Sequence, residues 1–268
     1  MLTELRTSKF KGCRYLKCGS GSDVLVLLHG FGEDHRIWKF QQEGLSASYT
    51  LLLPDVPGSG ESPIPEEKIT MELMAECVRD LLVQEEVEQA ILLGHSMGGY
   101  STLAFAEAYP ERLQAFGLIH STAYADDELK KENRRKSIRL MGNEGKDVFL
   151  QAMIPNLYHP DFAKQNASLL DEHLQMAKQI PVAHLQAYYQ AMIDRPDRTG
   201  VLQKSKVPVL LVAGSNDQAV PYTHLMEQGT LPAICDIEGI PYCGHTSMFE
   251  CPNVLESIIH KFCQFALL

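Results

Sequence analysis

The sequence has no long hydrophobic run and no excess of positive charge. None of its apolar stretches approaches the roughly 18 residues that a membrane-spanning helix needs. The formal net charge of −10 at pH 7 makes nucleic acid or an anionic membrane a poor partner, because phosphate groups must be neutralised by cations. The start of the chain carries no basic segment followed by an apolar one, so no secretory signal is predicted. We therefore expect a cytoplasmic protein that binds neither nucleic acid nor a membrane.

Paired cysteines and glycine-rich phosphate-binding patterns are also missing. The seven cysteines include no Cys-x-x-Cys pair, and the spacing of Cys13 and Cys18 matches no zinc-binding pattern. All seven are predicted to be free thiols, as is usual in the cytoplasm. The sequence contains neither the G-x-G-x-x-G pattern nor the G-x-x-x-x-G-K-[ST] pattern of nucleotide-binding loops. We expect neither a metal nor a cofactor.

What the sequence does contain is a series of apolar segments that alternate with helical patterns. The 268 residues are 45% hydrophobic and 22% charged, which is typical of a globular protein with a large core. Apolar runs typical of buried strands cover residues 24–28, 50–53, 90–93, 115–120, 207–213 and 234–240. Residues 1–20 are expected to add one or two edge strands. The alternation predicts an α/β fold, with a mostly parallel sheet of about eight strands flanked by helices.

The pattern changes between about residues 121 and 207, where strand-like runs are missing and several helical patterns are separated by prolines. We predict an α/β core formed by residues 1–121 and 207–268, and an all-helical cap formed by residues 122–206. The basic residues between Lys130 and Arg139 alternate with acidic ones, so this stretch is interpreted as a solvent-exposed helix face. Arg195 and Arg198 are expected at the junction of cap and core.

The stretch that organises the predicted chemistry is Gly94-His95-Ser96-Met97-Gly98. It follows an apolar strand and precedes a helical pattern, so the G-x-S-x-G motif stands in the strand–turn–helix context of a nucleophile elbow. A serine on so sharp a turn has strained backbone angles, and the positions two residues away must be small to avoid collision. Because a serine hydroxyl is a poor nucleophile by itself, another part of the chain must supply a base.

Asp217 and His245 are the candidates that complete this site. Both follow predicted strands, and ligands of open α/β sheets bind at the carboxyl ends of the strands. An imidazole titrates near neutral pH, so His245 can take the proton of Ser96 and return it to a leaving group. A carboxylate at Asp217 would fix the imidazole tautomer and stabilise the imidazolium. Asp55 and Asp236 remain open as alternatives for this carboxylate.

These motifs, in this order, resemble those of the α/β-hydrolase superfamily over essentially the whole chain. The matching patterns are HGFG at 29–32, DxPGxGxS at 55–62, GHSMGG at 94–99, GxxDxxVP at 214–221 and GH at 244–245. The resemblance implies an α/β-hydrolase fold with Ser96 as nucleophile, His245 as general base and Asp217 as orienting carboxylate. It also implies an oxyanion hole formed by the backbone N–H groups of Phe31 and Met97.

Other side chains are assigned to the substrate pocket or to its support. The predicted pocket residues, besides those of the oxyanion hole, are Trp38, His120, Tyr124 and Tyr188. A structural role for His120 is held equally open. His29 and His95 are predicted to be buried and hydrogen-bonded. Tyr189 and Met192, which neighbour Tyr188 at helical spacing, are interpreted mainly as packing of a cap helix.

The predicted activity is that of a serine hydrolase. Serine at position 96 argues against epoxide opening and dehalogenation, for which the superfamily uses aspartate there. We expect cleavage of a small carboxylic ester or a similar acyl substrate through an acyl-enzyme, by a monomer or homodimer. Alternatives on the same three residues are thioester hydrolysis, carbon–carbon bond hydrolysis, lyase chemistry of the menaquinone-pathway type and peracid formation. An alternative of another class is a receptor that binds a small hydrophobic hormone with little or no turnover.

Overall fold

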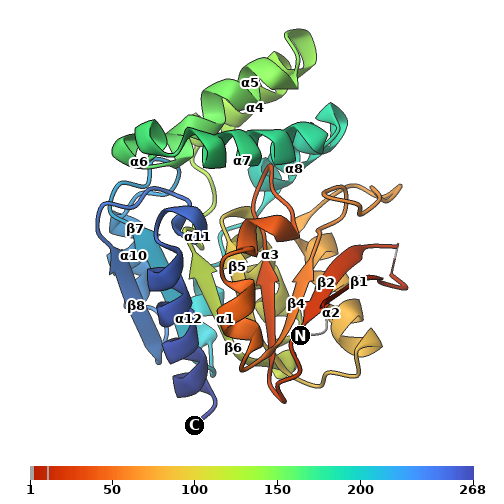
Figure 1. Ribbon diagram of the computed structural model, residues 1–268, viewed down its shortest axis with the longest axis vertical. Helices are drawn as coiled ribbons and strands as arrows, with labels where there is room; N and C mark the ends of the chain where they lie inside the picture. Colours follow the sequence, from red (N-terminus) through yellow and green to blue (C-terminus); the bar gives the residue numbers. More distant parts are fainter. Residues whose placement is uncertain (1–2, 11) are drawn as a thin grey trace.

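The computed structural model describes residues 3–10 and 12–268, and its centre is an eight-stranded sheet with helices on both faces (Figure 1). Residues 1, 2 and 11, which the predicted core includes, lie outside the described residues. The strands are β1 (Thr3–Thr7), β2 (Arg14–Cys18), β3 (Val24–Leu28), β4 (Thr50–Pro54), β5 (Ala90–His95), β6 (Leu113–Ile119), β7 (Val209–Gly214) and β8 (Cys235–Ile240). Their order in the sheet is β1-β2-β4-β3-β5-β6-β7-β8, and β3 to β8 run parallel. The predicted fold class is confirmed.

The central strands are apolar along their whole length because helices cover them on both sides. Every residue of β3, β5 and β7 is buried. β3 pairs with β5 in parallel, with Leu28 opposite Gly94, so both strands end at the same edge of the sheet. Of the one or two edge strands predicted for residues 1–20, β1 lies at an edge of the sheet. β2 lies inside the sheet, antiparallel to both β1 and β4.

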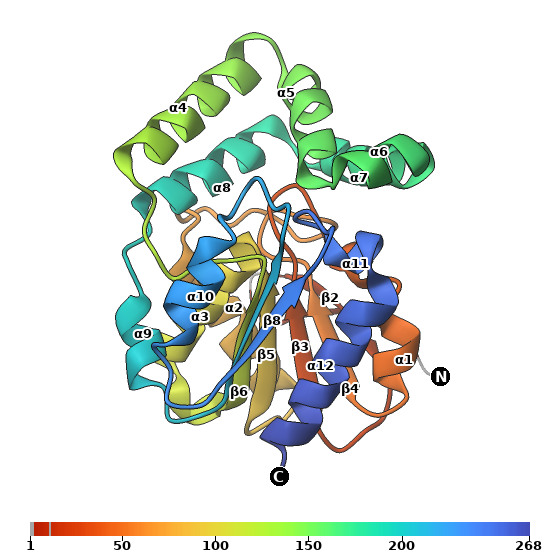
Figure 2. The same cartoon turned by 90° about the vertical axis from the view of Figure 1, so that its left-hand side faces the viewer.

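Helices fill the connections, and several are short. Those of the core are η1 (His35–Trp38), α1 (Gln42–Ser46), α2 (Met71–Gln84), α3 (Met97–Ala108), η2 (Pro110–Arg112), α10 (Thr223–Gly229), α11 (Ser247–Glu250) and α12 (Pro252–Ala266). α1 and α12 cover one face of the sheet, and α2, α3 and α10 cover the other (Figure 2). The side chain of Thr70 caps α2 by accepting a hydrogen bond from Leu73 N.

Two helix predictions need correction. The apolar residues Trp38, Phe40 and Leu45 after Asp34 predict one helix, but the chain forms two short pieces, η1 and α1. Asp34 does cap the first piece, because its carboxylate accepts a hydrogen bond from Arg36 N at 3.0 Å. The helical spacing of apolar residues in α12 predicts that Val254 and Phe265 share its buried face, but each is 50% exposed. The buried face of α12 is therefore narrower than the distribution of apolar residues in its sequence predicts.

The connection between β6 and β7 is entirely helical. It contains α4 (Glu128–Asn143), α5 (Lys146–Met153), η3 (Ile154–Leu157), α6 (Pro160–Gln165), α7 (Ala167–Gln179), α8 (Val182–Asp194) and α9 (Thr199–Lys204). Figures 1 and 2 show α4 to α8 beyond the carboxyl ends of the parallel strands. Arg198 ties this segment to the core through ion pairs with Glu72 on α2 and Glu107 on α3. The division into a core and a cap at residues 122 and 206 stays a prediction.

Two expectations about the chain as a whole can be compared with the structure. Among residues 3–10 and 12–268, we find no helix with the length and apolar character needed to cross a bilayer. Cys18, Cys235, Cys243, Cys251 and Cys263 are free thiols, as predicted, and the Sγ atoms of Cys13 and Cys77 lie 2.9 Å apart.

Candidate active site

The predicted nucleophile lies on the turn between β5 and α3. Ser96 has φ of 51° and ψ of −114°, a backbone conformation that is costly for any residue with a side chain. Both backbone polar groups of Ser96, its N–H and its C=O, are held by hydrogen bonds. Ser96 N donates to Ile119 O at 2.9 Å, and the hydroxyl of Ser121 donates to Ser96 O at 2.7 Å. Neighbouring strand β6 therefore holds the serine in its strained position.

The glycines around Ser96 are required by close backbone contacts, as the sequence predicted. A Cβ atom at Gly94 would lie 2.3 Å from the carbonyl oxygen of Gly98. A Cβ atom at Gly98 would lie 2.6 Å from the carbonyl oxygen of His29. Both contacts are far inside van der Waals distance and involve main chain, which cannot rotate away as a side chain could. The steric explanation of the G-x-S-x-G pattern is confirmed.

This packing predicts the outcome of adding one methyl group. Gly98→Ala should lower the free energy of unfolding by about 1–3 kcal/mol, because the new methyl group overpacks against β3. Gly200 in α9 is the matched control, since a Cβ atom there meets nothing within 4 Å. Gly200→Ala should raise the free energy of unfolding by about 0.5–1 kcal/mol, because alanine favours helix. Urea denaturation of both variants measures this, and equal effects would contradict the steric explanation.

The structure brings Ser96, His245 and Asp217 together from three separate loops. The Nε2 atom of His245 lies 2.8 Å from Ser96 Oγ, and its Nδ1 atom lies 2.7 Å from Asp217 Oδ2. Asp217 and His245 are buried, whereas Ser96 is partly accessible. The ring of His245 therefore bridges the hydroxyl and the carboxylate, an arrangement in which a proton can leave Ser96.

The carboxylate of Asp217 is fixed by two sets of hydrogen bonds. Its Oδ1 atom accepts from the backbone N–H groups of Ala219 and Val220, at 2.8 and 2.9 Å. Burial raises the pKa of Asp217, but the charges and hydrogen bonds of His245 and His120 lower it well below its usual range. Asp55, an alternative in the sequence, instead accepts from His35. Asp217 is thus the carboxylate that reaches His245.

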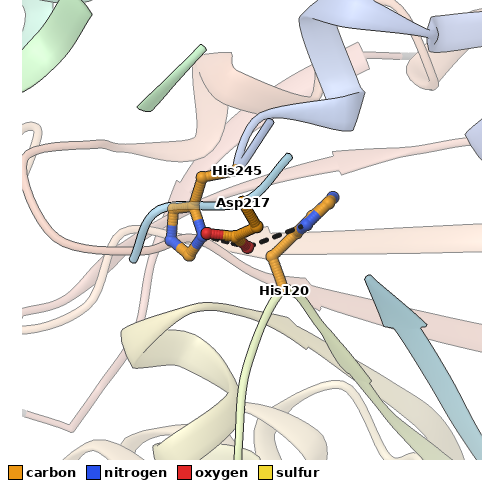
Figure 3. A group of neighbouring side chains, drawn as sticks. All are labelled: His120, Asp217 and His245. Atoms are coloured by element: carbon orange, nitrogen blue, oxygen red, sulfur yellow. Dashed lines mark hydrogen bonds and ion pairs between the residues drawn. The ribbon is translucent and has the colours of Figure 1, made fainter. Parts of the chain in front are cut away.

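His120 is a second histidine on the same carboxylate and does not line the cavity. Figure 3 shows His120 and His245 approaching Asp217 from different elements, with His120 Nδ1 at 3.3 Å from Asp217 Oδ2. Its Nε2 atom lies 2.8 Å from Ser247 Oγ, and the ring is fully buried. Burial is the main cause that lowers the pKa of His120. The structure therefore supports the structural role for His120, and the predicted substrate contact is wrong.

The two predicted oxyanion donors flank the serine. Phe31 follows β3 and lines the cavity beside Ser96, and Met97 is the first residue of α3. A Cβ atom at Gly30 would lie 3.1 Å from Ser96 Cβ, so this loop runs against the nucleophile. Among the described residues, none accepts a hydrogen bond from Phe31 N or Met97 N. The first N–H groups of a helix have no partner within the helix, which leaves Met97 N free for a ligand.

A buried ion pair lies behind the serine and was not predicted. Glu33 Oε2 lies 2.9 Å from His95 Nδ1 and accepts from Gly30 N at 2.6 Å. His95 Nε2 donates to the carbonyl oxygen of His245 at 2.9 Å. Burial opposes both charges, but the pairing with His95 lowers the pKa of Glu33 to about 2 and the pairing with Glu33 raises that of His95. This pair joins the Gly30 loop, the elbow and the main chain of His245.

His29 is buried and hydrogen-bonded, as predicted. Its Nε2 atom accepts from Val56 N at 3.0 Å and lies 2.8 Å from the hydroxyl of Ser59. His29 thereby fixes the loop after β4 to the loop after β3. The prediction for His95 was also correct in its burial and hydrogen bonding, but the charged partner Glu33 gave no signal in the sequence.

A cavity of about 240 Å³ adjoins Ser96 and His245. Its walls combine the sheet edge with the helical segment: Phe31, Glu33, His95, Ser96, Tyr100, Lys130, Arg134, Met153, Leu157, Tyr189, Met192, Gln218, Ala219, Val220 and His245. The interpretation of the basic stretch as a solvent-exposed face is wrong for Lys130 and Arg134. Tyr189 and Met192 line the cavity as well as packing in α8.

Three predicted pocket residues lie elsewhere and are corrected here. Trp38 is fully buried beneath the site, with its ring 6.5 Å from that of His95. Tyr188 is also fully buried, and its hydroxyl donates to Pro57 O at 2.7 Å. Tyr124 packs against His224, and its hydroxyl donates to Glu227 at 3.2 Å. None of the three side chains lines the cavity beside Ser96.

Among the described residues, two groups of side chains have atoms suited to bind a metal ion. His120, Asp217 and His245 form one group, and Asp34, His35 and Asp55 form the other, each with ligand atoms within 4.8 Å of one another. In the second group, Asp34 pairs with Arg36 and Asp55 with His35. The hydrogen bonds described above account for these atoms without an ion, and the expectation of no metal stays a prediction.

Known proteins share both the sequence pattern and the fold. A sequence profile of the alpha/beta hydrolase fold matches residues 23–143. The malate-bound structure of a thermophilic esterase from Thermogutta terrifontis superposes with a TM-score of 0.90, at 28% identity over 99% of both chains. A putative carbamate hydrolase of Azorhizobium caulinodans is 28% identical over 91% of this chain and 92% of its own length. The chain has the α/β-hydrolase fold, and the profile of that fold matches the part of the chain that includes Ser96.

A longer relative matches as well. The dihydrolipoyllysine-residue acetyltransferase component of the acetoin cleaving system of Cupriavidus necator is 25% identical over 263 residues. The match covers 92% of this chain and 65% of that protein, so the present chain spans about two thirds of its length.

Proposed function

We propose that the protein is a serine hydrolase that cleaves small carboxylic esters through an acyl-enzyme. The observation that carries this proposal is the continuous set of contacts from Ser96 Oγ through the His245 ring to Asp217, with distances of 2.8 and 2.7 Å. Proton transfer requires the nucleophile, the base and the orienting carboxylate to lie within hydrogen-bonding distance of one another, whatever their pKa values. The contacts lie at the carboxyl edge of the sheet, where ligands bind in this class of fold.

The proposed reaction has two halves that use the same groups. His245 Nε2 takes the proton of Ser96 as Oγ attacks the ester carbonyl, and Asp217 stabilises the resulting imidazolium. The N–H groups of Phe31 and Met97 stabilise the oxyanion, an effect worth about 3–4 kcal/mol per donor in comparable sites. His245 then gives the proton to the leaving alcohol. A water molecule, activated by the same ring, releases the acid from Ser96.

The helical segment between β6 and β7 is proposed to act as the cap of this site. Its helices supply Lys130, Arg134, Met153, Tyr189 and Met192 to the cavity wall. A cavity of about 240 Å³ limits the substrate to a small molecule and leaves little space for bulk water. Substrate would enter by movement of these helices relative to the sheet.

Covalent labelling together with steady-state turnover tests the proposal. A fluorophosphonate probe should label the wild-type protein and the Ser137→Ala variant, since the half-buried hydroxyl of Ser137 on α4 only donates to Asn133 O, but should not label Ser96→Ala. The wild-type protein should release p-nitrophenol from short-chain esters over many turnovers. A burst of about one equivalent without further release would instead indicate a receptor. Turnover of a diketone acid but not of esters would favour carbon–carbon bond hydrolysis.

A further inference from the structure

Cations outnumber carboxylates at one wall of the cavity. The buried carboxylate of Asp126 accepts from Arg134 Nε at 2.6 Å and from Arg195 Nη2 at 2.9 Å. Lys130 Nζ donates to the carbonyl oxygen of Ala219 at 3.0 Å, and no described carboxylate lies within ion-pair distance of it. Arg134 and Arg195 therefore share one carboxylate and Lys130 has none, which leaves a formal surplus of two positive charges.

This surplus is unusual in a chain with a net charge of −10. Lys130 and Arg134 are one helical turn apart on α4, so both point toward the cavity. Their neighbours Lys131 and Arg135 pair with Glu128 and Glu132 on the outer side of the same helix. Burying cations without matching anions is unfavourable, so an arrangement of this kind points to an anion supplied by a ligand.

Other charged groups of the cavity do not offset the surplus. Glu33 also lines the cavity, but the charge of His95 neutralises it. Asp217 is held by His245 and by two backbone N–H groups. The anion that complements Lys130 and Arg134 must therefore come from outside the described chain.

Tyr100 provides a third polar group next to these cations. It lies one turn after Ser96 on α3 and lines the same cavity, and no described residue forms a hydrogen bond with its hydroxyl. The guanidinium of Arg195 lies 3.8 Å from the centre of its ring. Burial raises the pKa of Tyr100, but Arg195, Lys130 and Arg134 together lower it below its usual value. The positive field of the three cations thus extends into the cavity.

From this arrangement we infer that the substrate carries a carboxylate, bound by Lys130, Arg134 and Tyr100 while its scissile carbonyl lies at Ser96. This inference rests on the proposed hydrolase function and specifies its substrate class as an ester with a free carboxylate. An ammonium, a guanidinium with its outer N–H groups available and a phenol hydroxyl are donors that suit the two oxygens of a carboxylate. A neutral ester of the same length would leave the cations Lys130 and Arg134 without an anionic partner.

Matched pairs of esters test the inference on the full-length protein. p-Nitrophenyl hydrogen glutarate and p-nitrophenyl valerate have the same chain length, and only the first carries an anion on the acyl side. 4-Acetoxybenzoate and phenyl acetate provide the same comparison on the leaving-group side. We expect kcat/KM of the wild-type protein to favour the anionic member of at least one pair. Equal or lower values for the anionic member of both pairs would overturn the inference.

Substitutions on α4 test whether the preference for the anionic ester depends on Lys130. Lys130→Met should reduce the preference for the anionic ester by about tenfold or more, as expected for loss of a hydrogen bond to a charged group. Lys130→Glu should reduce it further. Lys131→Met is the control, because Lys131 is one residue away but pairs with Glu128 outside the cavity, and its preference should equal that of the wild-type protein. A Lys130→Met variant that keeps the full wild-type preference would contradict the site.

A separate measurement distinguishes failure of the site from failure of the hydrolase proposal. If neither member of either pair is turned over and the fluorophosphonate does not label Ser96, the hydrolase proposal fails. Titration calorimetry with glutarate and with neutral 1-pentanol, on the wild-type and Lys130→Met proteins, still decides whether the cavity binds a carboxylate. Binding of glutarate that weakens at least tenfold in Lys130→Met supports the inference, and binding that is absent or unchanged overturns it.

Discussion

Replacing Ser96 with alanine is expected to lower kcat for short p-nitrophenyl esters by about 10⁴- to 10⁶-fold. The substitution removes the nucleophile, so no acyl-enzyme can form, and only the oxyanion donors and substrate binding remain to accelerate the reaction. Among the described residues, Ser96 Oγ forms a hydrogen bond only with the His245 ring. The free energy of unfolding should therefore change by no more than about 1 kcal/mol.

Two measurements make this result specific. Far-UV circular dichroism and urea denaturation of Ser96→Ala must match the wild-type protein, so that loss of activity is not loss of fold. Combining Ser96→Ala with His245→Ala should cost little more than Ser96→Ala alone, because residues that act as one unit are not additive. Retention of more than about 10% of wild-type kcat in the single variant would rule out Ser96 as the nucleophile.

Replacing Glu33 with alanine is expected to lower the free energy of unfolding by about 3–5 kcal/mol. The side chains of Glu33 and His95 are both about 1% exposed, so removal of the carboxylate leaves a buried imidazolium without its counter-ion. It also leaves Gly30 N, beside the nucleophile, without its acceptor. Urea denaturation at pH 6 measures the loss. The control is Glu132→Ala, whose surface ion pairs with Arg135 and Arg139 should contribute little.

The pH dependence of stability should identify the same pair. The pKa of Glu33 is about 2 in the folded protein and ordinarily 4.5, so its stabilisation is complete above pH 4.5 and is lost as the pH falls toward 2. The pKa of His95 is raised above its ordinary 6.5, so its contribution is complete below pH 6.5 and is lost as the pH rises through the folded value. The difference in unfolding free energy between wild type and Glu33→Ala should be largest from pH 4.5 to 6.5. A difference that is independent of pH would mean that the pair is not ionised.

The sequence by itself determined the sheet, the elbow and the places of the three central residues. Apolar runs without polar alternation mark strands that are covered on both faces, and helices between them require parallel neighbours. Parallel strands end at one edge of the sheet, so residues that follow different strands meet there whatever their separation along the chain. Ser96, Asp217 and His245 could be brought together on this argument alone. The need for small residues at 94 and 98 was also predictable from the motif, although at Gly98 the colliding main chain belongs to β3 and the loop after it, not to the turn.

Only the tertiary structure decided which side chains face the cavity. Periodicity groups residues on one face of a helix, but it does not say which neighbour that face meets. Lys130 and Arg134 share a face that the sequence assigned to solvent and that α4 turns toward Ser96. Tyr188 and Tyr189 are adjacent, yet only Tyr189 reaches the cavity, because successive residues of a helix point about 100° apart. Such choices depend on how separate helices pack over the sheet, and that packing is set by contacts between segments far apart in the chain.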